Sequence, residues 1–218
     1  MIYETLKTHP EVLALLEQGN YNLGVMGYTD HSMIHCALVA DRAAYILKAL
    51  GHSEQEQELA RIAGVLHDIG NAINRKNHAE YGALLANDIL KEVGLSTADR
   101  LRVVSAIGNH DESTGGPKDP ISAALILADK SDVRQDRVRT TDREKFDIHD
   151  RVNYAVTGHN LKVDPVEKKI SLNLQVDESV CAMYEYFDIF LGRMLMCRSA
   201  AEMLGAKFRL RVNGGKVL

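Results

Sequence analysis

The sequence has few cysteines and no long apolar run, and both features limit what the protein can be. Its 218 residues include three cysteines, Cys36, Cys181 and Cys197, an odd number without CxxC spacing. We therefore expect no disulfide framework, no cysteine zinc site and a reduced, cytoplasmic setting. No apolar stretch approaches the roughly 18 residues that span a bilayer. Residues 1–17 also lack the basic start and apolar centre of a signal peptide.

A strong charge of either sign is also missing. Lysine and arginine total 26 and aspartate and glutamate 30, which leaves a net charge of −4. This balance gives no global reason to expect a nucleic acid or a membrane as partner. A content of 45% hydrophobic and 26% charged residues is typical of a soluble globular protein. The length suits one well-buried domain, or one domain with a small appendage.

Apolar periodicity and capping residues predict helices throughout the first two thirds of the chain. Ser53 and Glu56 have the spacing of a capping box, Thr29 or Asp30 can cap the preceding helix, and Asn77 can cap the following one. Glycine and proline mark further starts and stops. The predicted helices are residues 11–18, 31–50, 53–67, 78–93, 96–109 and 119–132.

The pattern changes near residue 150. Apolar residues alternate over 152–156, 170–176 and 208–212, which predicts strands, and Asp164-Pro165 suits a turn. Residues 178–204 read as one long helix. The predicted fold class is therefore mainly α: a helical domain over 1–148 and a small α+β unit over 149–218, with a short antiparallel sheet and one long helix. Apolar residues lie around most of the circumference of that helix. We therefore expect it to pack in the core or to contact a second subunit in a homodimer.

The pair His67-Asp68 is the most informative feature of the sequence. It closes the apolar run 62–66, and an imidazole beside a carboxylate suits Mn, Fe, Zn or Mg-type ions. Asp129 follows the apolar run 123–128, where an unpaired carboxylate would be costly and a cation is a good partner. Further polar side chains lie on the other predicted helices, and helical bundles build metal sites from such inward-pointing groups. These are His35, His78 and His110.

At these residues the sequence resembles the HD-domain superfamily of metal-dependent phosphohydrolases, over roughly residues 25 to 135. The family motif H…HD…D is met by His35, His67-Asp68 and Asp129. The segments that carry the resemblance are 35–40 (HCALVA), 66–70 (LHDIG), His78 with Gly82, 109–112 (NHDE) and 127–129 (LAD).

The two extra histidines resemble the subset of the family with a second metal. This subset includes HD-GYP phosphodiesterases and the bacterial symmetrical diadenosine-tetraphosphate hydrolases. No GYP triplet follows His110, which argues against hydrolysis of cyclic di-GMP. Residues 128–132 (ADKSD) and the arginines after them are more similar to the diadenosine-tetraphosphate hydrolases, although the C-terminal unit is not expected there.

The resemblance implies a helical HD-domain bundle and a site with one or two divalent ions. Iron or manganese are the first expectation, and Mg, Zn, Ni or Co also fit the ligand types. The second ion would share Asp68 as a bridge. A metal-activated water would attack phosphorus. The implied ligands are His35, His67, Asp68 and Asp129 for the first ion, and His78 and His110 for the second.

Other residues receive supporting roles. If the helix over 119–132 continues past Lys130, Lys130 and Arg134 lie on one face and can both contact a phosphate group. The predicted catalytic residues are therefore Asp68, Lys130 and Arg134. Asp111 or Glu112 can orient a histidine ligand. His31 lines the site or is an exposed first-turn residue. The cluster Arg134, Arg137, Arg139 and Arg143 alternates with acidic residues and forms a salt-bridged surface or a phosphate site.

The predicted function is hydrolysis of a phosphoester or phosphoanhydride in a nucleotide or related small phosphorylated metabolite. Two other hypotheses about the function stay open. Some HD-domain proteins, such as inositol oxygenases, use a similar ligand set as di-iron oxygenases. A non-catalytic nucleotide sensor would bind its ligand without turnover.

Overall fold

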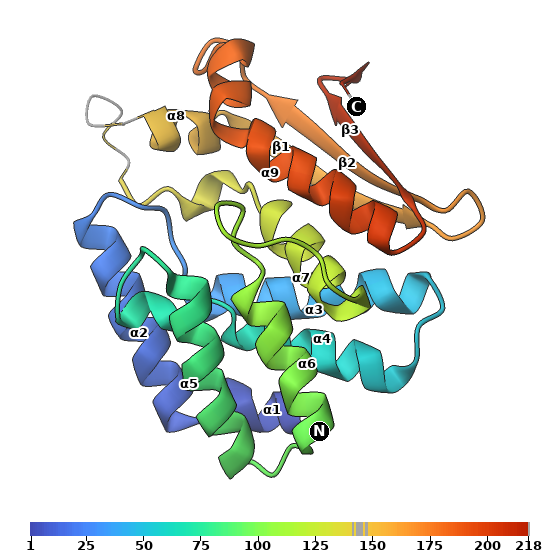
Figure 1. Cartoon of the computed structure of the whole chain (residues 1–218). Coiled ribbons are helices and arrows are strands. Elements are labelled where there is room, and N and C mark those ends of the chain that lie inside the picture. The colour runs from blue at the N-terminus through green and yellow to red at the C-terminus, as the bar shows by residue number, and fades with distance from the viewer. Residues whose placement is uncertain (141, 143–145, 147, 218) are drawn as a thin grey trace.

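The computed structural model describes residues 1–140, 142, 146 and 148–217. Helices occupy the first two thirds, as predicted, and stack into the helical body of the molecule (Figure 1). Their bounds are α1 Ile2–Lys7, α2 Pro10–Val25, α3 Met33–Ala49, α4 Glu54–Leu66, α5 His78–Glu92, α6 Thr97–Gly108 and α7 Pro120–Lys130, with 3₁₀ turns η1 Ile69–Ala72 and η2 Gln135–Arg137.

The helix starts follow local hydrogen bonding. The predicted capping box opens α4: the Ser53 hydroxyl accepts from the Glu56 N–H at 3.3 Å, and the Glu56 carboxylate accepts from the Ser53 N–H at 3.3 Å. Asp119 caps α7 in the same way, ahead of Pro120. The helix predicted from 31 begins at Met33 instead, because Ser32 is the capping residue. Asp30 supports that cap by accepting from the Ser32 hydroxyl at 2.7 Å.

Two helix ends differ from the prediction. Helix α2 runs through Gly19, where the sequence suggested a stop. A Cβ at Gly19 would lie 3.0 Å from the Ala72 nitrogen, so this glycine allows η1 to pack closely and does not end the helix. Helix α7 ends at Lys130 and the chain turns at Ser131, two residues before the predicted end at Asp132.

The C-terminal part holds the predicted sheet and long helix. Its elements are α8 Ile148–Tyr154, β1 Val156–Asp164, β2 Lys169–Val176, α9 Met183–Met203, β3 Lys207–Val212 and β4 Gly215–Lys216, with strand order β1-β2-β3-β4. The mainly helical class is confirmed, but the sheet is mixed because β3 runs parallel to β2. The reason is that α9 is a crossover that returns the chain to the same end of the sheet.

Residues 152–154, predicted as the start of a strand, are the end of α8, and only Val156 opens β1. Two or three alternating apolar residues are too few to separate a strand from a helical turn.

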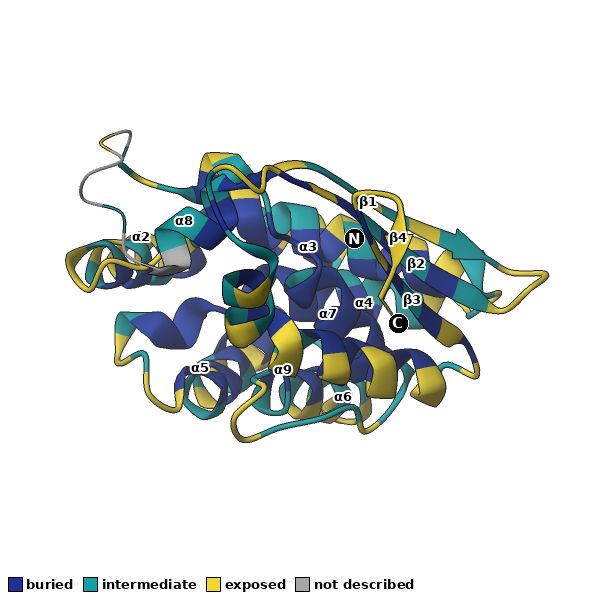
Figure 2. Cartoon of the chain, turned by 90° about the horizontal axis from the view of Figure 1, so that it is seen from above, coloured by how far each residue is buried: buried dark blue, intermediate teal, exposed yellow. Residues whose placement is uncertain are grey.

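Helix α9 lies between the helical body and the sheet (Figure 1). It packs against α7 on one side and β3 on the other, and a single hydrophobic cluster joins Leu66 and Leu127 to Phe190 and Leu172. Viewed from above, buried segments of α3, α4 and α7 form the centre of the molecule (Figure 2). The division at residue 148 stays a prediction. Among the described residues, no helix is long and apolar enough to cross a membrane.

Candidate metal centre

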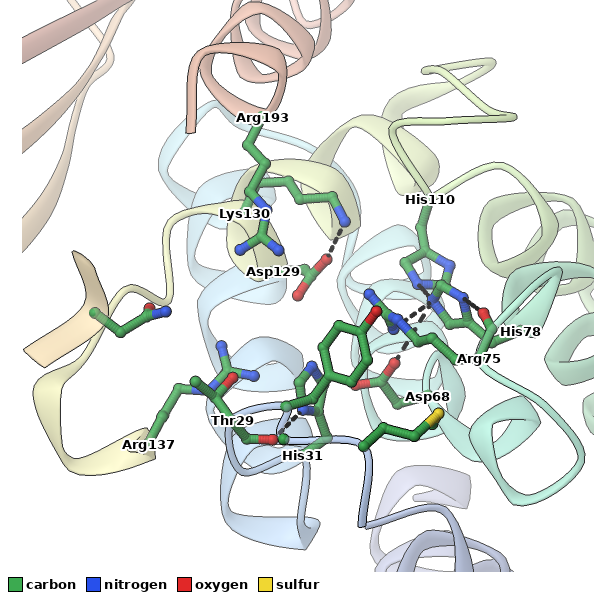
Figure 3. Close-up of a pocket in the computed structure, with 14 residues that line it drawn as sticks. Thr29, His31, Asp68, Arg75, His78, His110, Asp129, Lys130, Arg137 and Arg193 are labelled. Carbon is green, nitrogen blue, oxygen red and sulfur yellow. Dashed lines mark hydrogen bonds and ion pairs between the residues drawn. The ribbon is translucent and has the colours of Figure 1, made fainter. Parts of the chain in front are cut away.

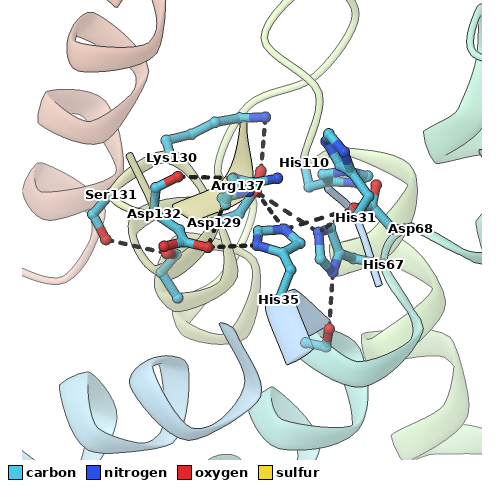
Figure 4. A network of polar contacts seen from close by, with 12 residues as sticks. His31, His35, His67, Asp68, His110, Asp129, Lys130, Ser131, Asp132 and Arg137 are labelled. Carbon is cyan, nitrogen blue, oxygen red and sulfur yellow. Dashed lines mark hydrogen bonds and ion pairs between the residues drawn. The ribbon is translucent and has the colours of Figure 1, made fainter. Parts of the chain in front are cut away.

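The residues predicted as metal ligands come from five helices and meet at one place. His35 lies on α3, His67-Asp68 follows α4, His78 opens α5, His110 follows α6, and Asp129 lies on α7. Helices α3 and α4 approach closely because Gly64 has no side chain: a Cβ there would lie 2.5 Å from the Ala40 Cα. Five of these side chains point toward one another in Figure 4: those of His35, His67, Asp68, His110 and Asp129.

The first group of ligand atoms surrounds one point. His35 Nε2 lies 3.4 Å from Asp129 Oδ1 and 3.6 Å from Asp68 Oδ2. His67 Nε2 lies 3.2 Å from Asp68 Oδ2 and 3.7 Å from Asp129 Oδ1. Both histidines have no exposed surface. Two imidazole nitrogens and two carboxylate oxygens converge, which is a donor set suited to a divalent transition metal.

The second group shares Asp68 with the first. Asp68 Oδ1 lies 3.8 Å from His78 Nε2, while its Oδ2 faces His35 and His67. His78 Nε2 lies 3.2 Å from His110 Nε2. Asp68, His78 and His110 are all buried, and each offers one ligand atom; these atoms lie within 4.8 Å of one another, close enough to share an ion. One carboxylate therefore presents its two oxygens to two neighbouring groups.

Hydrogen bonds at the far side of each ring fix which nitrogen faces the site. The Nδ1 of His67 lies 2.8 Å from the Gly64 carbonyl, and the Nδ1 of His110 lies 2.6 Å from the Ile107 carbonyl. A carbonyl only accepts, so Nδ1 carries a hydrogen, and in the neutral ring the lone pair is then on Nε2. His78 makes the same bond to the Arg75 carbonyl at 3.1 Å.

Several of these atoms have no hydrogen-bond partner in the part of the chain that the structure describes. His35 Nε2, His67 Nε2 and Asp68 Oδ2 are buried without a hydrogen bond among the described residues. His78 Nε2 and His110 Nε2 face each other as two acceptors at 3.2 Å, and Arg75 Nη1 lies 3.3 Å from His78 Nε2. Burial of unpaired polar atoms is costly, and a cation resolves both features at once. The residues present therefore fit a metal.

The electrostatics favour the metal-binding forms of His78, His110 and Asp68, whereas at His67 burial is outweighed by Asp68 and Asp129, which raise its pKa well above the usual range. Burial lowers the pKa of His110 to about 3, with His78 and His67 adding to the effect. Burial and Arg75 also lower the pKa of His78. Burial alone would raise the pKa of Asp68, but the surrounding histidines, His67 above all, hold it well below its usual range. Neutral imidazoles and an ionised carboxylate are the forms that bind metals.

Asp132 contacts a predicted ligand, although no local pattern in the sequence marks it. Its Oδ2 lies 2.7 Å from His35 Nδ1, on the side of the ring away from the site. Burial opposes its ionisation, but the bond from His35 and the charge of Arg137 hold its pKa far below the usual range. Asp132 thus orients His35. The sequence reasoning had given such a role to Asp111 or Glu112; Asp111 Oδ2 lies 3.6 Å from His78 Nδ1.

A pocket of about 240 Å³ opens onto the ligand cluster (Figure 3). Asp68, His78, His110 and Asp129 form its floor. Cationic side chains come from four separate segments: Arg75 before α5, Lys130 at the end of α7, Arg137 in η2 and Arg193 on α9. The pocket is therefore positively charged around a site that holds carboxylates, although the whole chain has a net charge of −4.

Lys130 reaches the pocket as predicted. Its Nζ lies 2.8 Å from Asp129 Oδ2 and 2.7 Å from Glu112 Oε2. Glu112 in turn accepts from Arg193 Nε at 3.1 Å. Burial opposes the charge on Lys130, but Asp129 and Glu112 raise its pKa above the ordinary value. This chain of ion pairs joins α9 to a predicted metal ligand.

Arg134 is not brought to the pocket. Its Nε donates to Asp132 Oδ1 at 2.7 Å and its Nη1 lies 3.2 Å from Asp136 Oδ2. The prediction assumed that the helix continued past Lys130, and because α7 ends there the two cations do not share a face. Arg75 and Arg193 take the place that sequence reasoning gave to Arg134, and no local signal marked them.

The remaining residues of the sequence prediction are distributed as follows. His31 lines the pocket, and its Nδ1 lies 2.7 Å from the Thr29 carbonyl. Arg137 also lines it, donating to the Asp30 carbonyl at 2.9 Å. Arg139 contacts backbone carbonyls of Tyr28, Asn20 and Thr29. Arg143 lies outside the described residues.

The segment that matches a known family is close to the segment, roughly residues 25 to 135, over which the resemblance was noted. Residues 33–135 match the family described as HD domain, and they include every predicted ligand. The chain contains an HD domain. The match agrees with the superfamily expected from the sequence, and the buried His/Asp groups lie within it.

The chain is similar to an archaeal protein and to bacterial ribonucleases that are longer than it is. An uncharacterized protein of Methanocaldococcus jannaschii is 30% identical over 173 residues, 68% of this chain and 66% of the relative. Ribonuclease Y of Lawsonia intracellularis is 32% identical over 127 residues, 57% of this chain and 21% of the relative. Ribonuclease Y of Campylobacter jejuni subsp. doylei is 30% identical over 125 residues, 56% of this chain and 22% of the relative. The chain thus spans just under two thirds of the archaeal relative and about a fifth of the ribonucleases.

Proposed function

We propose that this protein is a metal-dependent phosphohydrolase that cleaves a phosphoester or phosphoanhydride bond of a nucleotide or a related small phosphorylated metabolite. One observation carries the proposal. Buried imidazole and carboxylate atoms that have no hydrogen-bond partner among the described residues converge at the floor of a pocket whose wall holds four cationic side chains. The floor suits a divalent cation, and the wall suits a phosphate group.

The chain offers ligands for two ions. His35, His67, Asp68 and Asp129 would hold the first, and His78 and His110 would hold the second, with Asp68 shared. Bound divalent ions lower the pKa of coordinated water and neutralise phosphate oxygens. Iron or manganese are expected, with Mg, Zn, Ni or Co also compatible. The two facing Nε2 atoms of His78 and His110 support a binuclear site.

The chain's own residues bind and orient the phosphate. Lys130, held by Asp129 and Glu112, directs an ammonium group toward the floor of the pocket (Figure 3). Arg75 and Arg193 present guanidinium groups from opposite sides, and such groups bind phosphate oxygens in pairs. Asp132 keeps the His35 ring in place through its bond to Nδ1.

The space around the pocket supports a small substrate. A volume of about 240 Å³ is small even for a ligand site, because drug-sized ligands occupy roughly 300–1,000 Å³. A second, more open groove adjoins it and shares Tyr28 and Arg75 with it. We therefore place the reacting phosphate in the pocket and the rest of the substrate along the groove. The relatives named ribonuclease support phosphoester cleavage as the reaction class.

Metal analysis and a phosphate-release screen test the proposal. Protein purified without chelators is analysed for metal content and assayed under nitrogen with Mn²⁺ or Mg²⁺ over nucleotides and dinucleotides. Asp68→Ala should abolish both bound metal and turnover. The double variant His78→Ala/His110→Ala should halve the metal bound per chain. His52→Ala, outside the pocket, is the matched control and should change neither.

Phosphate release by Asp68→Ala at the wild-type rate would contradict the proposal. Oxygen consumption without phosphate release would favour the oxygenase reading. Tight nucleotide binding by a metal-loaded protein that releases no phosphate from any substrate would favour the sensor.

A further inference from the structure

The sheet has one face that the helical body does not use. Ile170, Leu172, Phe208 and Leu210 point to the buried face, which α9 covers. The alternate residues of β2 and β3 point the other way. Their register brings cations together across the strands: Lys169 lies opposite Lys207, Ser171 opposite Arg209, and Arg211 opposite Lys216.

These residues surround a shallow hollow of about 370 Å³. Its lining consists of five cations, one carboxylate and one hydroxyl: Lys169, Lys207, Arg209, Arg211, Lys216, Glu167 and Ser171. We call this surface the basic sheet face. None of its five cations forms an ion pair with another residue in the described part of the chain. It shares no residue with the pocket at the metal centre.

Placing these cations next to one another lowers the stability of the sheet, and the fold does not require it. Like charges directly opposite each other on a sheet are destabilising. Lysines protect the edges of sheets from pairing with other chains, but Lys169 lies on the inner strand β2, with Asp164 of β1 opposite it on one side and Lys207 of β3 on the other, and edge protection does not explain it. Five unpaired cations on one hollowed face are instead explained by an anionic partner that neutralises them together.

We propose that the basic sheet face binds a nucleic acid through its phosphate backbone. Cations on β3 recur every second residue, at a spacing of roughly 6.6 Å along the strand, which presents a row of positive charge to a polyanion. Ser171 and Asn173 lie between the cations, and hydroxyl and amide groups also bond to phosphate and sugar. The face carries no aromatic residue, so it has nothing on which bases stack, and binding depends on the backbone.

A membrane fits this surface less well than a nucleic acid. Proteins that bind anionic bilayers combine cations with apolar side chains that enter the lipid, and the lining of the hollow has no apolar residue. The net charge of −4 gives no sign of this surface, because it sums the charges of the whole chain. The strand register places several cations together on one face.

Fluorescence anisotropy with labelled RNA tests the proposal. The full chain is titrated against an RNA of mixed sequence, as a single strand and as a duplex, and against a DNA duplex of the same length, over a range of salt concentrations. The variant Lys207→Gln/Arg209→Gln/Arg211→Gln should weaken binding by roughly tenfold or more at low salt, and the salt slope should fall by about two to three, one for each lost phosphate contact. Asp68→Ala should bind as wild type does, which separates this outcome from the hydrolase proposal.

The matched control removes three exposed cations elsewhere: Lys48→Gln/Lys91→Gln/Arg198→Gln. This variant has the same net charge and should bind as tightly as wild type. An equal loss of affinity in both variants, or no binding by wild type at low salt, would overturn the proposal. So would binding to phosphatidylserine-containing vesicles in the absence of RNA or DNA binding. Circular dichroism confirms folding, and Arg211→Gln alone replaces the triple variant if that variant unfolds.

Discussion

The bond between Asp132 and His35 decides how one predicted ligand presents its lone pair. The carboxylate sits 2.7 Å from Nδ1 and is fully buried, so the ring has one tautomer and one orientation. Charged partners of this kind raise the basicity of the opposite nitrogen. The orientation of His35 is therefore fixed by a residue that was not itself predicted as a ligand.

Replacing this carboxylate should weaken metal binding. We expect Asp132→Asn to lower metal affinity by about 10–100-fold, because outer partners of ligating histidines have effects of this size. Competition with a chromophoric chelator measures the change. Asp136→Asn is the control, since Asp136 also pairs with Arg134 but is exposed. Unchanged affinity in Asp132→Asn would show that the His35 ring is held by packing alone.

Helix α4 carries His67 and Asp68 at its end, and its start depends on the Ser53–Glu56 capping box. Partial burial opposes ionisation of Glu56, but hydrogen bonds from Ser53 and Arg102 lower its pKa below the ordinary value of 4.5. A carboxylate with a lowered pKa in the folded state stabilises the fold above its unfolded pKa. That contribution is lost as the pH falls through the folded pKa.

Glutamine can keep the capping-box hydrogen bond but loses the charge beside Arg102 and the helix N-terminus, so Glu56→Gln should be less stable than wild type by about 0.3–1 kcal/mol at neutral pH. The difference should shrink as the pH drops below about 4.5, the ordinary value for glutamate. Urea unfolding at several pH values measures it. Glu54→Gln, an exposed first-turn residue, should show a smaller and less pH-dependent change. A difference that grows on acidification would contradict the assignment.

The contact between α3 and α4 sets the distance between His35 and His67. A side chain at Gly64 would collide with the Ala40 backbone, with a Cβ-to-nitrogen distance of 2.6 Å. We expect Gly64→Ala to destabilise the protein by about 1–3 kcal/mol and to weaken metal binding, because the two helices must separate. Thermal unfolding and metal titration measure the two effects.

Gly192 on α9 is the matched control, since a Cβ there meets nothing within 4 Å. Gly192→Ala should stabilise the protein by up to about 1 kcal/mol through helix propensity. Wild-type stability and metal affinity in Gly64→Ala would show that the helices adjust without moving the ligands.

At the scale of the whole molecule, α9 connects the C-terminal part to the pocket. Arg193 lines the pocket and pairs with Glu112, which pairs with Lys130. The helix also packs against α7, which carries Asp129. The C-terminal part therefore completes the wall of a site whose floor belongs to the HD domain.

Arg193→Gln should raise KM for a phosphorylated substrate by about tenfold with a smaller effect on kcat, since hydrogen bonds to charged groups contribute about 1.5–3 kcal/mol. Arg198→Gln on the same helix is exposed and should leave both constants unchanged. Steady-state kinetics with the substrate found in the screen measures both variants. An unchanged KM in Arg193→Gln would show that this guanidinium only pairs with Glu112.

The sequence by itself determined most helices of the first two thirds, the caps at Ser53 and Asp119, and the types of side chain that meet at the centre. Apolar periodicity, Ser53-Glu56 and His67-Asp68 are local signals, and they are readable because capping and helix faces depend on residues three or four apart. Lys130 beside Asp129 was readable for the same reason.

Only the tertiary structure decided which distant groups became neighbours. Asp132 reaches His35 across 97 positions, and Arg193 reaches Glu112 across 81. The direction of β3 and the basic sheet face depend on how the chain returns after α9. Such pairs are set by how elements pack, and packing depends on the whole buried surface at once, so spacing along the chain carries no record of it.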